Sequence, residues 1–379
     1  MHVAVLGAGY AGVTVARRLE RSLPESADIV VVDDSSEHLV RHEVHRLIRR
    51  PGFVEDIAVP LEGLFDRART VTDRVTRVDP DANRVELASN DPIEYDYAAV
   101  CLGAETAFYD LPGVEEHALP LRDVEHAETL RAEALDLIDA GGGRVVVGGA
   151  GLSGVQVAGE LAALSREEEA SDRVEVVLTE MRDSVAPGFS AGFQEAVHDA
   201  LETEGVDVRT GVTIEGADGT VVAIENGEIS YDLFVWTGGI SGPAPLENER
   251  PRVRSNLRHG DSTFVVGDAA MIVDREGEAV PASAQAALAE AEVAATNIAD
   301  LVEYDRDGGT FEPRLEGVSF SPTGWVVSVG DGTVAIVGGA ILRGRAALAA
   351  KATSGVGHLS SIGATSRAIE LAREEFAKS

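Results

Sequence analysis

The chain opens with the stretch HVAVLGAGYAGVTVARRL, residues 2–19, and this stretch decides the expected fold. Residues 2–6 are apolar and rich in β-branched side chains, as in a buried strand. Residues 13–19 have apolar side chains at helical spacing, and a second apolar run at 29–32 ends on Asp33. The first strand and the helix are joined by three glycines in G-x-G-x-x-G spacing: Gly7, Gly9 and Gly12. The order of strand, glycine turn, helix, strand and acid predicts a βαβ unit.

Each part of this unit has a physical reason to bind a dinucleotide. The first glycine makes the tight turn, the second lets a pyrophosphate approach the backbone, and the third lets helix and strand pack closely. The helix N-terminus presents N–H groups to the phosphates. Asp33 follows Gly12 at nearly the usual spacing of about 20 positions, where a carboxylate accepts ribose hydroxyls.

The same pattern returns in RVVVGGAGLSGVQVAGEL, residues 144–161, which predicts a second dinucleotide site. The next apolar run, 174–179, ends on Glu180. A carboxylate there binds a free ribose 2′-OH and repels a 2′-phosphate, which favours NADH over NADPH, although Arg182 is close enough to weaken that preference. The glycines of this second fingerprint are Gly149, Gly151 and Gly154.

Length and pattern predict an α/β fold with two Rossmann-like domains and a small C-terminal region. A chain of 379 residues exceeds the size that one core usually supports. We expect a discontinuous first dinucleotide domain at 1–110 and 245–315, with the second domain inserted at 111–244. The remaining residues, 316–379, contain predicted strands at 318–320, 324–330 and 333–337 and a last helix at about 361–377, and they are expected to face a membrane or form a homodimer.

The net charge of −33 opposes binding to nucleic acid and to anionic lipid. Acidic residues are spread along the whole chain, as in proteins kept soluble in concentrated salt, where a Debye length of about 3 Å screens self-repulsion. We expect no secretory leader, because residues 2–6 already form a strand, and therefore a cytoplasmic protein. The longest apolar candidate for a membrane span, 334–350, contains Arg343 and Arg345, so at most peripheral contact with the inner face of the membrane is expected.

The single cysteine, Cys101, excludes an intrachain disulfide, an iron–sulfur cluster and a C-x-x-C pair. Because it lies in an apolar run, we interpret it as a buried structural thiol. The histidine-containing segment 38–45 lacks the ligand pattern of a metal site, so its histidines are interpreted as solvated or nucleotide-flanking, and no metal is expected. Within it, Arg41 and His42 are candidates to contact the dinucleotide.

Three further glycines end apolar strands, at the sheet edge where ligands of such folds bind. They are Gly103, Gly238 and Gly267. Asp268 follows the last of these and is either a ligand residue or a cap for the next segment. An alanine-rich helix is predicted from Pro281 to about Leu301, and by pattern alone its Gln285 is an ordinary helix residue.

These motifs together resemble the two-dinucleotide flavoproteins of the pyridine nucleotide oxidoreductase superfamily, and most of all the type II NADH dehydrogenases. The likeness extends over nearly the whole chain and includes the segments 5–12, 148–161, 235–239, 265–268 and 284–287. It implies FAD in the first site and NADH in the second. It also implies that Asp33 holds the FAD ribose, that Asp268 holds the ribityl or phosphate region, and that Gln285 lies near the quinone-facing side of the flavin.

The resemblance further implies that Glu160 lies near the nicotinamide and supports proton delivery to the quinone. The chain departs from the family at two positions. Ala289 stands where the A-Q-x-A-x-Q motif has its last glutamine, although Glu290 follows at once. Gln156 replaces a glutamate that is common in the second nucleotide helix.

The implied activity is hydride transfer from NADH to FAD, followed by transfer of two electrons to a quinone or another small acceptor. The lone cysteine excludes disulfide and thioredoxin reductases and disfavours sulfide:quinone oxidoreductases. Two alternatives stay open. One is a soluble NADH-dependent reductase of a small electron-carrier protein, and the other is a non-catalytic flavoprotein that senses NADH or redox state.

Overall fold

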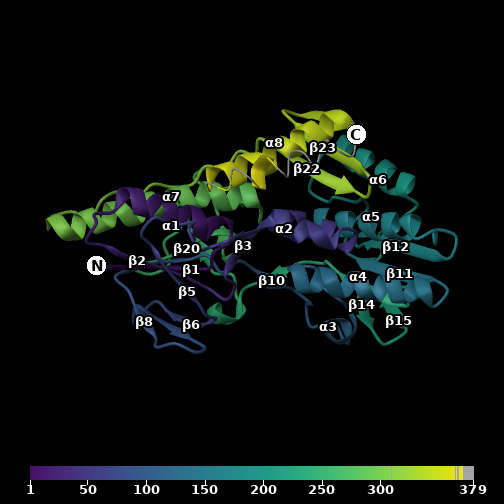
Figure 1. Ribbon diagram of the computed structural model, residues 1–379, viewed down its shortest axis with the longest axis horizontal. Helices are drawn as coiled ribbons and strands as arrows, with labels where there is room; N and C mark the ends of the chain where they lie inside the picture. The colour runs from purple at the N-terminus through teal and green to yellow at the C-terminus, as the bar shows by residue number, and fades with distance from the viewer. Residues whose placement is uncertain (309, 363, 365–366, 370–379) are drawn as a thin grey trace. The chain divides into compact units, whose positions relative to one another are not determined.

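The computed structural model describes residues 1–308, 310–362, 364 and 367–369, and the chain separates into two compact units (Figure 1). Unit 1 consists of Met1–Val40, Ala58–Glu105 and Ile240–Pro322, and unit 2 of Arg41–Ile57, Thr106–Gly239 and Thr323–Ser379. This division differs from the expected boundaries in two places. Residues 41–57 group with unit 2, and so does the C-terminal region from Thr323, because both segments pack on the helices of unit 2.

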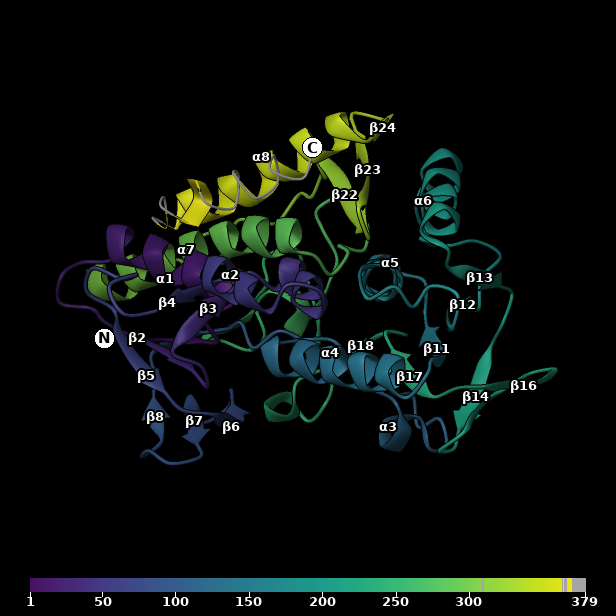
Figure 2. The ribbon, with the colours of Figure 1, turned by 45° about the vertical axis from the view of Figure 1, so that its right-hand side comes forward.

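Unit 1 is built on a five-stranded parallel sheet in the order β20-β9-β1-β2-β5. Its strands are β1 (His2–Leu6), β2 (Asp28–Asp33), β5 (Arg69–Thr72), β9 (Tyr97–Val100) and β20 (Thr263–Val265). Helices α1 (Tyr10–Ser22) and α7 (Ala284–Asp307) lie side by side (Figures 1 and 2). Because the strands are parallel, the segments that follow β1, β2, β9 and β20 all emerge at one edge of the sheet.

Smaller elements complete unit 1. A short pair, β3 (Glu37–Leu39) and β4 (Ala58–Pro60), and an antiparallel sheet β6-β7-β8 follow the βαβ unit. The bounds of the remaining elements are β6 (Val75–Asp79), β7 (Arg84–Leu87), β8 (Ile93–Glu94), β18 (Ile240–Ser241), η3 (Ala244–Leu246), β19 (Arg252–Val253), η4 (Gly267–Ala269) and β21 (Met271–Ile272), with β10 (Glu105–Thr106) at the boundary between the units.

Unit 2 repeats the plan with a four-stranded parallel sheet in the order β13-β12-β11-β17. The strands are β11 (Gly143–Gly148), β12 (Val174–Glu180), β13 (Asp207–Thr210) and β17 (Leu233–Trp236). Its main helices are α4 (Val124–Asp139), α5 (Leu152–Glu167) and α6 (Ala191–Glu204). The central strands are almost continuously apolar, as expected for a sheet buried on both faces.

Two further segments pack on α5. The 3-10 helix η1 (Arg41–Ile48) contacts α4 and α5, and the antiparallel sheet β22-β23-β24 contacts α5 and α6. The other elements of unit 2 are η2 (Pro51–Phe53), α2 (Val54–Ile57), α3 (Val114–His117), β14 (Ile214–Ala217), β15 (Val221–Ile224), β16 (Gly227–Ser230), β22 (Gly324–Val329), β23 (Gly332–Val337), β24 (Ala340–Arg343) and α8 (Arg345–Ser361).

The predicted α/β class is confirmed, and most errors concern the C-terminal part of the chain. The strands predicted at 324–330 and 333–337 are present as β22 and β23, but 318–320 forms no strand. Helix α7 begins at Ala284 and not at Pro281, because the Ser283 hydroxyl caps it by accepting a hydrogen bond from the Ala286 N–H. Helix α8 was not predicted. The helix predicted at 361–377 lies mostly outside the described residues.

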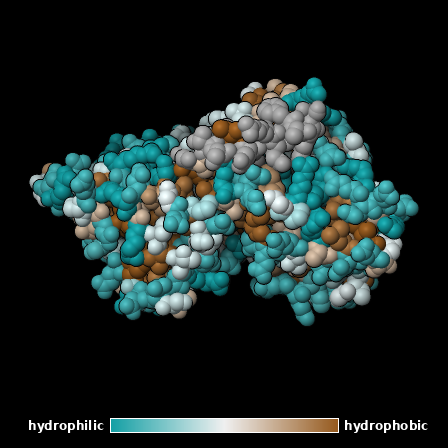
Figure 3. Space-filling model, viewed as in Figure 1, coloured by the Kyte–Doolittle hydropathy of each residue, from teal (hydrophilic) through white to brown (hydrophobic). Residues whose placement is uncertain are grey.

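The polarity of the surface and the character of the helices both bear on function. Hydrophilic residues cover most of the face seen in Figure 3, in keeping with a chain in which 26% of residues are charged. Among the described residues, the structure contains no helix whose length and apolar character would let it span a bilayer.

Candidate functional site

The first glycine loop, between β1 and α1, has a backbone that only glycine fits. Gly7 has φ +97°, and a Cβ there would lie 2.4 Å from the carbonyl oxygen of Cys101. A Cβ at Gly12 would lie 1.7 Å from the carbonyl oxygen of Gly7. A Cβ at Gly9, by contrast, would point into open space. The loop is therefore closed against its own sheet and open on the side where a ligand would approach.

The start of α1 suits an anion. Gly9 is the N-cap, and the first turn of the helix is uncharged, so its backbone N–H groups are left for a ligand. Asp33 stands beside the loop: its Oδ2 accepts the Ala8 N–H at 2.5 Å and its Oδ1 accepts the Ser35 N–H at 2.9 Å. These features fit a dinucleotide pyrophosphate over the helix and a ribose at the acid.

His38 and Tyr10 support this loop through contacts that the sequence did not predict. His38 is fully buried, and its Nδ1 lies 2.8 Å from the Ala8 carbonyl oxygen. Its ring also contacts that of Tyr10 edge to face, with centroids 5.5 Å apart. Of the two interpretations of the histidines in segment 38–45, solvated or nucleotide-flanking, the first is wrong for His38 and for His45, which is 3% exposed. No local signal marks a histidine that will pack under a loop 30 residues earlier.

The Gly267–Asp268 turn lies at the same sheet edge, after β20. Gly267 has φ +72° and begins η4, and Asp268 is half-buried. Arg250 braces the turn by donating hydrogen bonds to the carbonyl oxygens of Asp268 at 2.7 Å and Ala270 at 2.8 Å. Gly103, with φ +73°, follows the neighbouring strand β9. The parallel sheet thus gathers three predicted segments at one edge.

Gln285 lies in unit 1 as the second residue of α7. It is half-buried, one residue after the helix start that Ser283 caps. Arg41 and His42 belong to η1 in unit 2, where both are exposed, while the first glycine loop belongs to unit 1. The Nε2 of His42 lies 3.5 Å from Oε1 of Glu43.

The second glycine loop, between β11 and α5, repeats the first. Gly149 has φ +97°, a Cβ at Gly154 would lie 1.9 Å from the carbonyl oxygen of Gly149, and the N-cap Gly151 faces open space. The Oε2 of Glu180 accepts the Ala150 N–H at 2.8 Å, and its Oε1 accepts the Arg182 N–H at 2.9 Å. The second site therefore has the same uncapped helix and the same loop-bound acid.

The end of β17 closes the second loop. The Thr237 hydroxyl lies 3.0 Å from the carbonyl oxygen of Gly148 and 2.8 Å from that of Gly149. A Cβ at Gly238 would lie 2.3 Å from the Trp236 ring. The Trp236 indole N–H donates to the Ala107 carbonyl oxygen at 2.8 Å, which fixes the ring.

Glu160 lies in the middle of α5 in a buried group of charges. Its Oε2 accepts a hydrogen bond from the Arg49 Nε at 2.5 Å, and both side chains are almost fully buried. Arg49 also donates to Glu167 at 2.9 Å and to Asp331 at 2.8 Å, so that it joins η1, α5 and the β22–β23 turn. Burial alone would lower the pKa of Arg49, but Glu160 and Asp331 together raise it beyond its usual range. The geometry is that of a structural ion network.

A second buried pair adjoins this network. The Lys351 Nζ lies 3.0 Å from Glu43 Oε2. Although burial alone would raise it, the pKa of Glu43 is held well below its usual range by Lys351 and the neighbouring Arg46 and histidines. His45, 3.9 Å from Glu160, has a pKa lowered chiefly by burial, and its Nε2 has no hydrogen-bond partner among the described residues.

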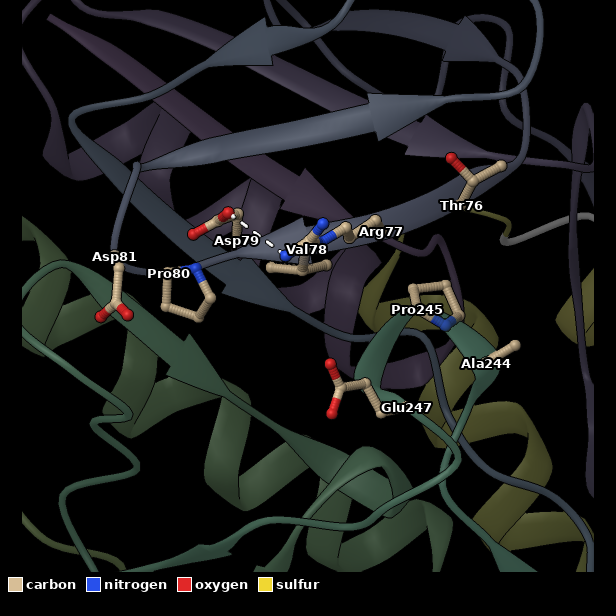
Figure 4. Close-up of a pocket in the computed structure, with 9 residues that line it drawn as sticks. All are labelled: Thr76, Arg77, Val78, Asp79, Pro80, Asp81, Ala244, Pro245 and Glu247. Atoms are coloured by element: carbon tan, nitrogen blue, oxygen red, sulfur yellow. Dashed lines mark ion pairs between the residues drawn. The ribbon is translucent and has the colours of Figure 1, made fainter.

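Other concave or acidic regions offer less. No group of ligating side chains in the described part of the chain could hold a metal ion. A polar pocket of about 500 Å³ lies in unit 1 between β6 and η3 (Figure 4). Within it Arg77 and Asp79 form an ion pair of 3.6 Å, and Glu247 stands on the η3 side. It contains none of the predicted site residues.

Comparison with known proteins agrees with this geometry. A curated Staphylococcus aureus protein named type II NADH:quinone oxidoreductase is 27% identical over 383 residues, covering 92% of this chain and 93% of its own. The fold matches NDH2 from Plasmodium falciparum, solved with NADH, with a TM-score of 0.84 at 14% identity, covering 98% and 97% of the chains. It also matches the sulfide:quinone oxidoreductase of Aquifex aeolicus, with a TM-score of 0.75 at 20% identity, covering 91% and 87%.

The resemblance to type II NADH dehydrogenases is thereby confirmed. Residues 1–291, which include both glycine loops and the Gly267–Asp268 turn, match the model of a single family. The chain belongs to the pyridine nucleotide-disulphide oxidoreductase family.

Proposed function

We propose that this chain is an FAD-dependent NADH:quinone oxidoreductase that passes hydride from NADH to FAD and then two electrons to a quinone. The observation that carries the proposal is the repeated loop geometry, in which two uncapped helix N-termini are each paired with a loop-bound acid. Two such sites in one chain suit an enzyme that binds two dinucleotides. The curated relatives named type II NADH:quinone oxidoreductase support the choice of acceptor.

FAD is assigned to unit 1. Bound there, FAD supplies the group that accepts a hydride and releases two electrons. The α1 N-terminus faces the pyrophosphate, Asp33 holds the ribose, and Asp268 holds the ribityl or phosphate region. The backbone of the site is shaped by five glycines: Gly7, Gly9, Gly12, Gly103 and Gly267.

NADH is assigned to unit 2. The α5 N-terminus faces its pyrophosphate, and Glu180 accepts its ribose hydroxyls. Glu180 is 6% exposed and already bound to two backbone N–H groups, so its carboxylate is fixed in place. A 2′-phosphate would meet this carboxylate at close range, which favours NADH over NADPH. The glycines of the site are Gly149, Gly151, Gly154 and Gly238.

The acceptor is assigned to the start of α7. Gln285 is half-buried in the first turn of that helix and is proposed to lie on the quinone-facing side of the flavin. With Cys101 as the sole cysteine, the chain lacks the pair of thiols that disulfide reductases use, so a small acceptor such as quinone fits best. Because Ala289 stands where the family motif has its last glutamine, the proposed quinone site has one polar side chain fewer than that motif provides.

We infer that Glu160 is a positioning residue. Its carboxylate is buried and accepts a hydrogen bond from the buried Arg49 guanidinium, so protonating it would weaken the ion pair at the centre of the network. The pair holds α5, whose N-terminus carries the second glycine loop. This arrangement favours an indirect role over the proton delivery that the resemblance implies.

Peripheral contact with the inner face of the cell membrane, and a homodimer formed through the C-terminal region, complete the proposal. Quinones partition into bilayers, so an enzyme that reduces them gains from contact with the membrane surface. Co-sedimentation with vesicles and sedimentation equilibrium test these two points separately.

Stopped-flow spectroscopy in multimolar KCl tests the function. NADH is mixed with the purified holoprotein and the flavin absorbance is followed, and a soluble menaquinone analogue is added next. Rapid bleaching followed by rapid recovery is expected. Bleaching without recovery would contradict the quinone assignment and favour a carrier protein or a sensor role. If NADH causes no bleaching, the assignment of the second site is wrong.

A further inference from the structure

Glu290 is a buried carboxyl group of unit 1 that contacts the Gly267–Asp268 turn. It lies on the second turn of α7 and is 2% exposed. Its Oε2 accepts a hydrogen bond from the Gly267 N–H at 2.7 Å. Glu290 thereby holds the backbone at the residue directly before Asp268, at the sheet edge where the cofactor is assigned.

The groups that face Glu290 do not neutralise it. The Asp268 carboxylate approaches from η4, the Arg250 guanidinium from the segment before β19, and the Cys101 thiol from the end of β9. Arg250 is directed to the carbonyl oxygens of the turn. Among the described residues, no side chain forms an ion pair with Glu290. Burial, together with the charge of Glu290, raises the pKa of Cys101, so the thiol stays neutral.

The protonation of Glu290 is balanced near neutral pH before any cofactor binds. Burial raises its pKa most, and the nearby Asp268 raises it further. The hydrogen bond from Gly267 and the charge of Arg250 act in the other direction, and the resulting pKa is about 7. Any added negative charge or loss of water at this turn favours the neutral acid.

A bound dinucleotide brings both changes. Its pyrophosphate is dianionic, and its atoms displace water from the turn. We propose that Glu290 takes up one proton from solvent when FAD binds at the Gly267–Asp268 turn and keeps it while the cofactor is bound. This inference rests on the proposed function, which places FAD there. One O–H bond forms on the Glu290 carboxylate, and no electron moves.

Proton uptake makes the site less negative at no cost to its shape. The remaining carboxyl oxygen still accepts the Gly267 N–H, so the turn keeps its conformation. In a chain with a net charge of −33, one fewer carboxylate beside a dianionic ligand favours binding. FAD affinity then rises as pH falls through neutrality.

Isothermal titration of FAD into the full chain freed of cofactor measures the proton directly. Titrations are run at pH 7 and fixed KCl, in phosphate and in Tris, whose ionisation enthalpies differ. The wild type is expected to take up about half a proton per FAD, because about half of Glu290 is ionised beforehand. Glu290→Gln keeps an oxygen for the Gly267 N–H and is expected to take up none. Glu292→Gln, an exposed change on the same helix, should match the wild type.

The pH dependence of FAD affinity gives a second readout. The wild-type dissociation constant is expected to rise roughly five- to tenfold between pH 6 and pH 8, and that of Glu290→Gln to stay constant. If Glu290→Gln takes up as much proton as the wild type, the inference is overturned. If neither protein binds FAD, the proposed function itself fails.

The wild type alone decides the matter should Glu290→Gln not fold. An infrared difference spectrum, FAD-bound minus apoprotein at pH 8, should then show a new protonated-carboxyl band. A spectrum with FAD bound and without that band would contradict the inference.

Discussion

The two glycine loops of this chain have nearly the same geometry, but the surroundings that hold them differ. Gly7 and Gly149 share φ +97°, and the third glycine of each loop sits under the carbonyl oxygen of the first. In each unit an acid, Asp33 or Glu180, accepts one hydrogen bond from a backbone N–H of the loop. It accepts a second from the backbone N–H of the residue two positions after the acid itself. Because the two loops share the G-A-G-x-x-G pattern and lie in different surroundings, we infer that the local sequence sets the loop geometry.

The support beneath the loops is where the units diverge. In unit 1, α1 lies against α7, and the link between their surfaces is an exposed ion pair between Arg18 and Glu292. In unit 2, α5 is joined to η1 and the β22–β23 turn by the buried Arg49–Glu160 network. The same loop geometry is therefore stabilised by packing between two helices in unit 1 and by a buried ion network in unit 2. Substitutions in these two regions should lower the stability of the protein by different amounts.

The largest expected effect comes from removing the central cation of the buried network. Arg49→Met removes the guanidinium from the buried Glu160 carboxyl group, and the free energy of unfolding should fall by about 3–5 kcal/mol. Hydrogen exchange should speed up in α5 and β22 of unit 2 while β1 of unit 1 stays protected. Arg18→Met, which removes the exposed pair of unit 1, should cost under about 1 kcal/mol. Equal losses in the two variants would contradict the comparison.

Substituting the third glycine of each loop separates the two sites. Gly12→Ala places a methyl group against the Gly7 carbonyl, and Gly154→Ala does the same at Gly149, each with an expected cost of about 1–3 kcal/mol or more. Gly12→Ala should purify without flavin. Gly154→Ala should keep its flavin but not be reduced by NADH. Absorbance spectra and anaerobic NADH titration measure both outcomes.

Gly9→Ala is the control for the first loop, since its Cβ points into open space. The apoprotein should keep wild-type stability and lose FAD affinity only. A loss of stability equal to that of Gly12→Ala would show that the loop is closed on both sides.

Replacing the two acids tests their ligands. Asp33→Ala is expected to lose FAD, and Glu180→Ala to raise the NADH concentration needed for flavin reduction while FAD stays bound. Each removes charge-assisted hydrogen bonds worth about 1.5–3 kcal/mol, or roughly 10- to 100-fold in affinity. Flavin content and the NADH dependence of reduction are the measurements. Full flavin content in Asp33→Ala would overturn the first assignment.

The smallest expected effect is a pH dependence of the free energy of unfolding that arises from His45 in unit 2. Burial holds the pKa of His45 below its usual value near 6.5, so below that pH the unfolded chain binds a proton that the folded unit does not. The stability that neutral His45 contributes is thus present above pH 6.5 and falls by up to about 1.4 kcal/mol per pH unit below it. His45→Gln should flatten this slope in denaturant unfolding, and exposed His198→Gln should not. Identical slopes in all three proteins would exclude His45 as the cause.

Much of the fold was predictable because its signals are local. A parallel strand buried on both faces has to be apolar along its whole length, and a tight turn under a helix has to use glycine, so β1, β11 and both loops are readable from neighbouring residues. Asp33 and Glu180 follow for the same reason, since the strand after the helix must end beside the loop.

What the local pattern does not carry are contacts between residues far apart in the chain. His38 packs under Ala8, Arg49 reaches Glu160 and Asp331, and Glu290 meets Gly267. Within its own segment, each of these side chains is an ordinary polar residue. Only burial in the packed core, where water is excluded, makes a hydrogen bond or ion pair with a distant residue necessary. The glycine and strand patterns of the sequence predict two dinucleotide sites, whereas tertiary packing determines which buried charged residues hold the two loops in place.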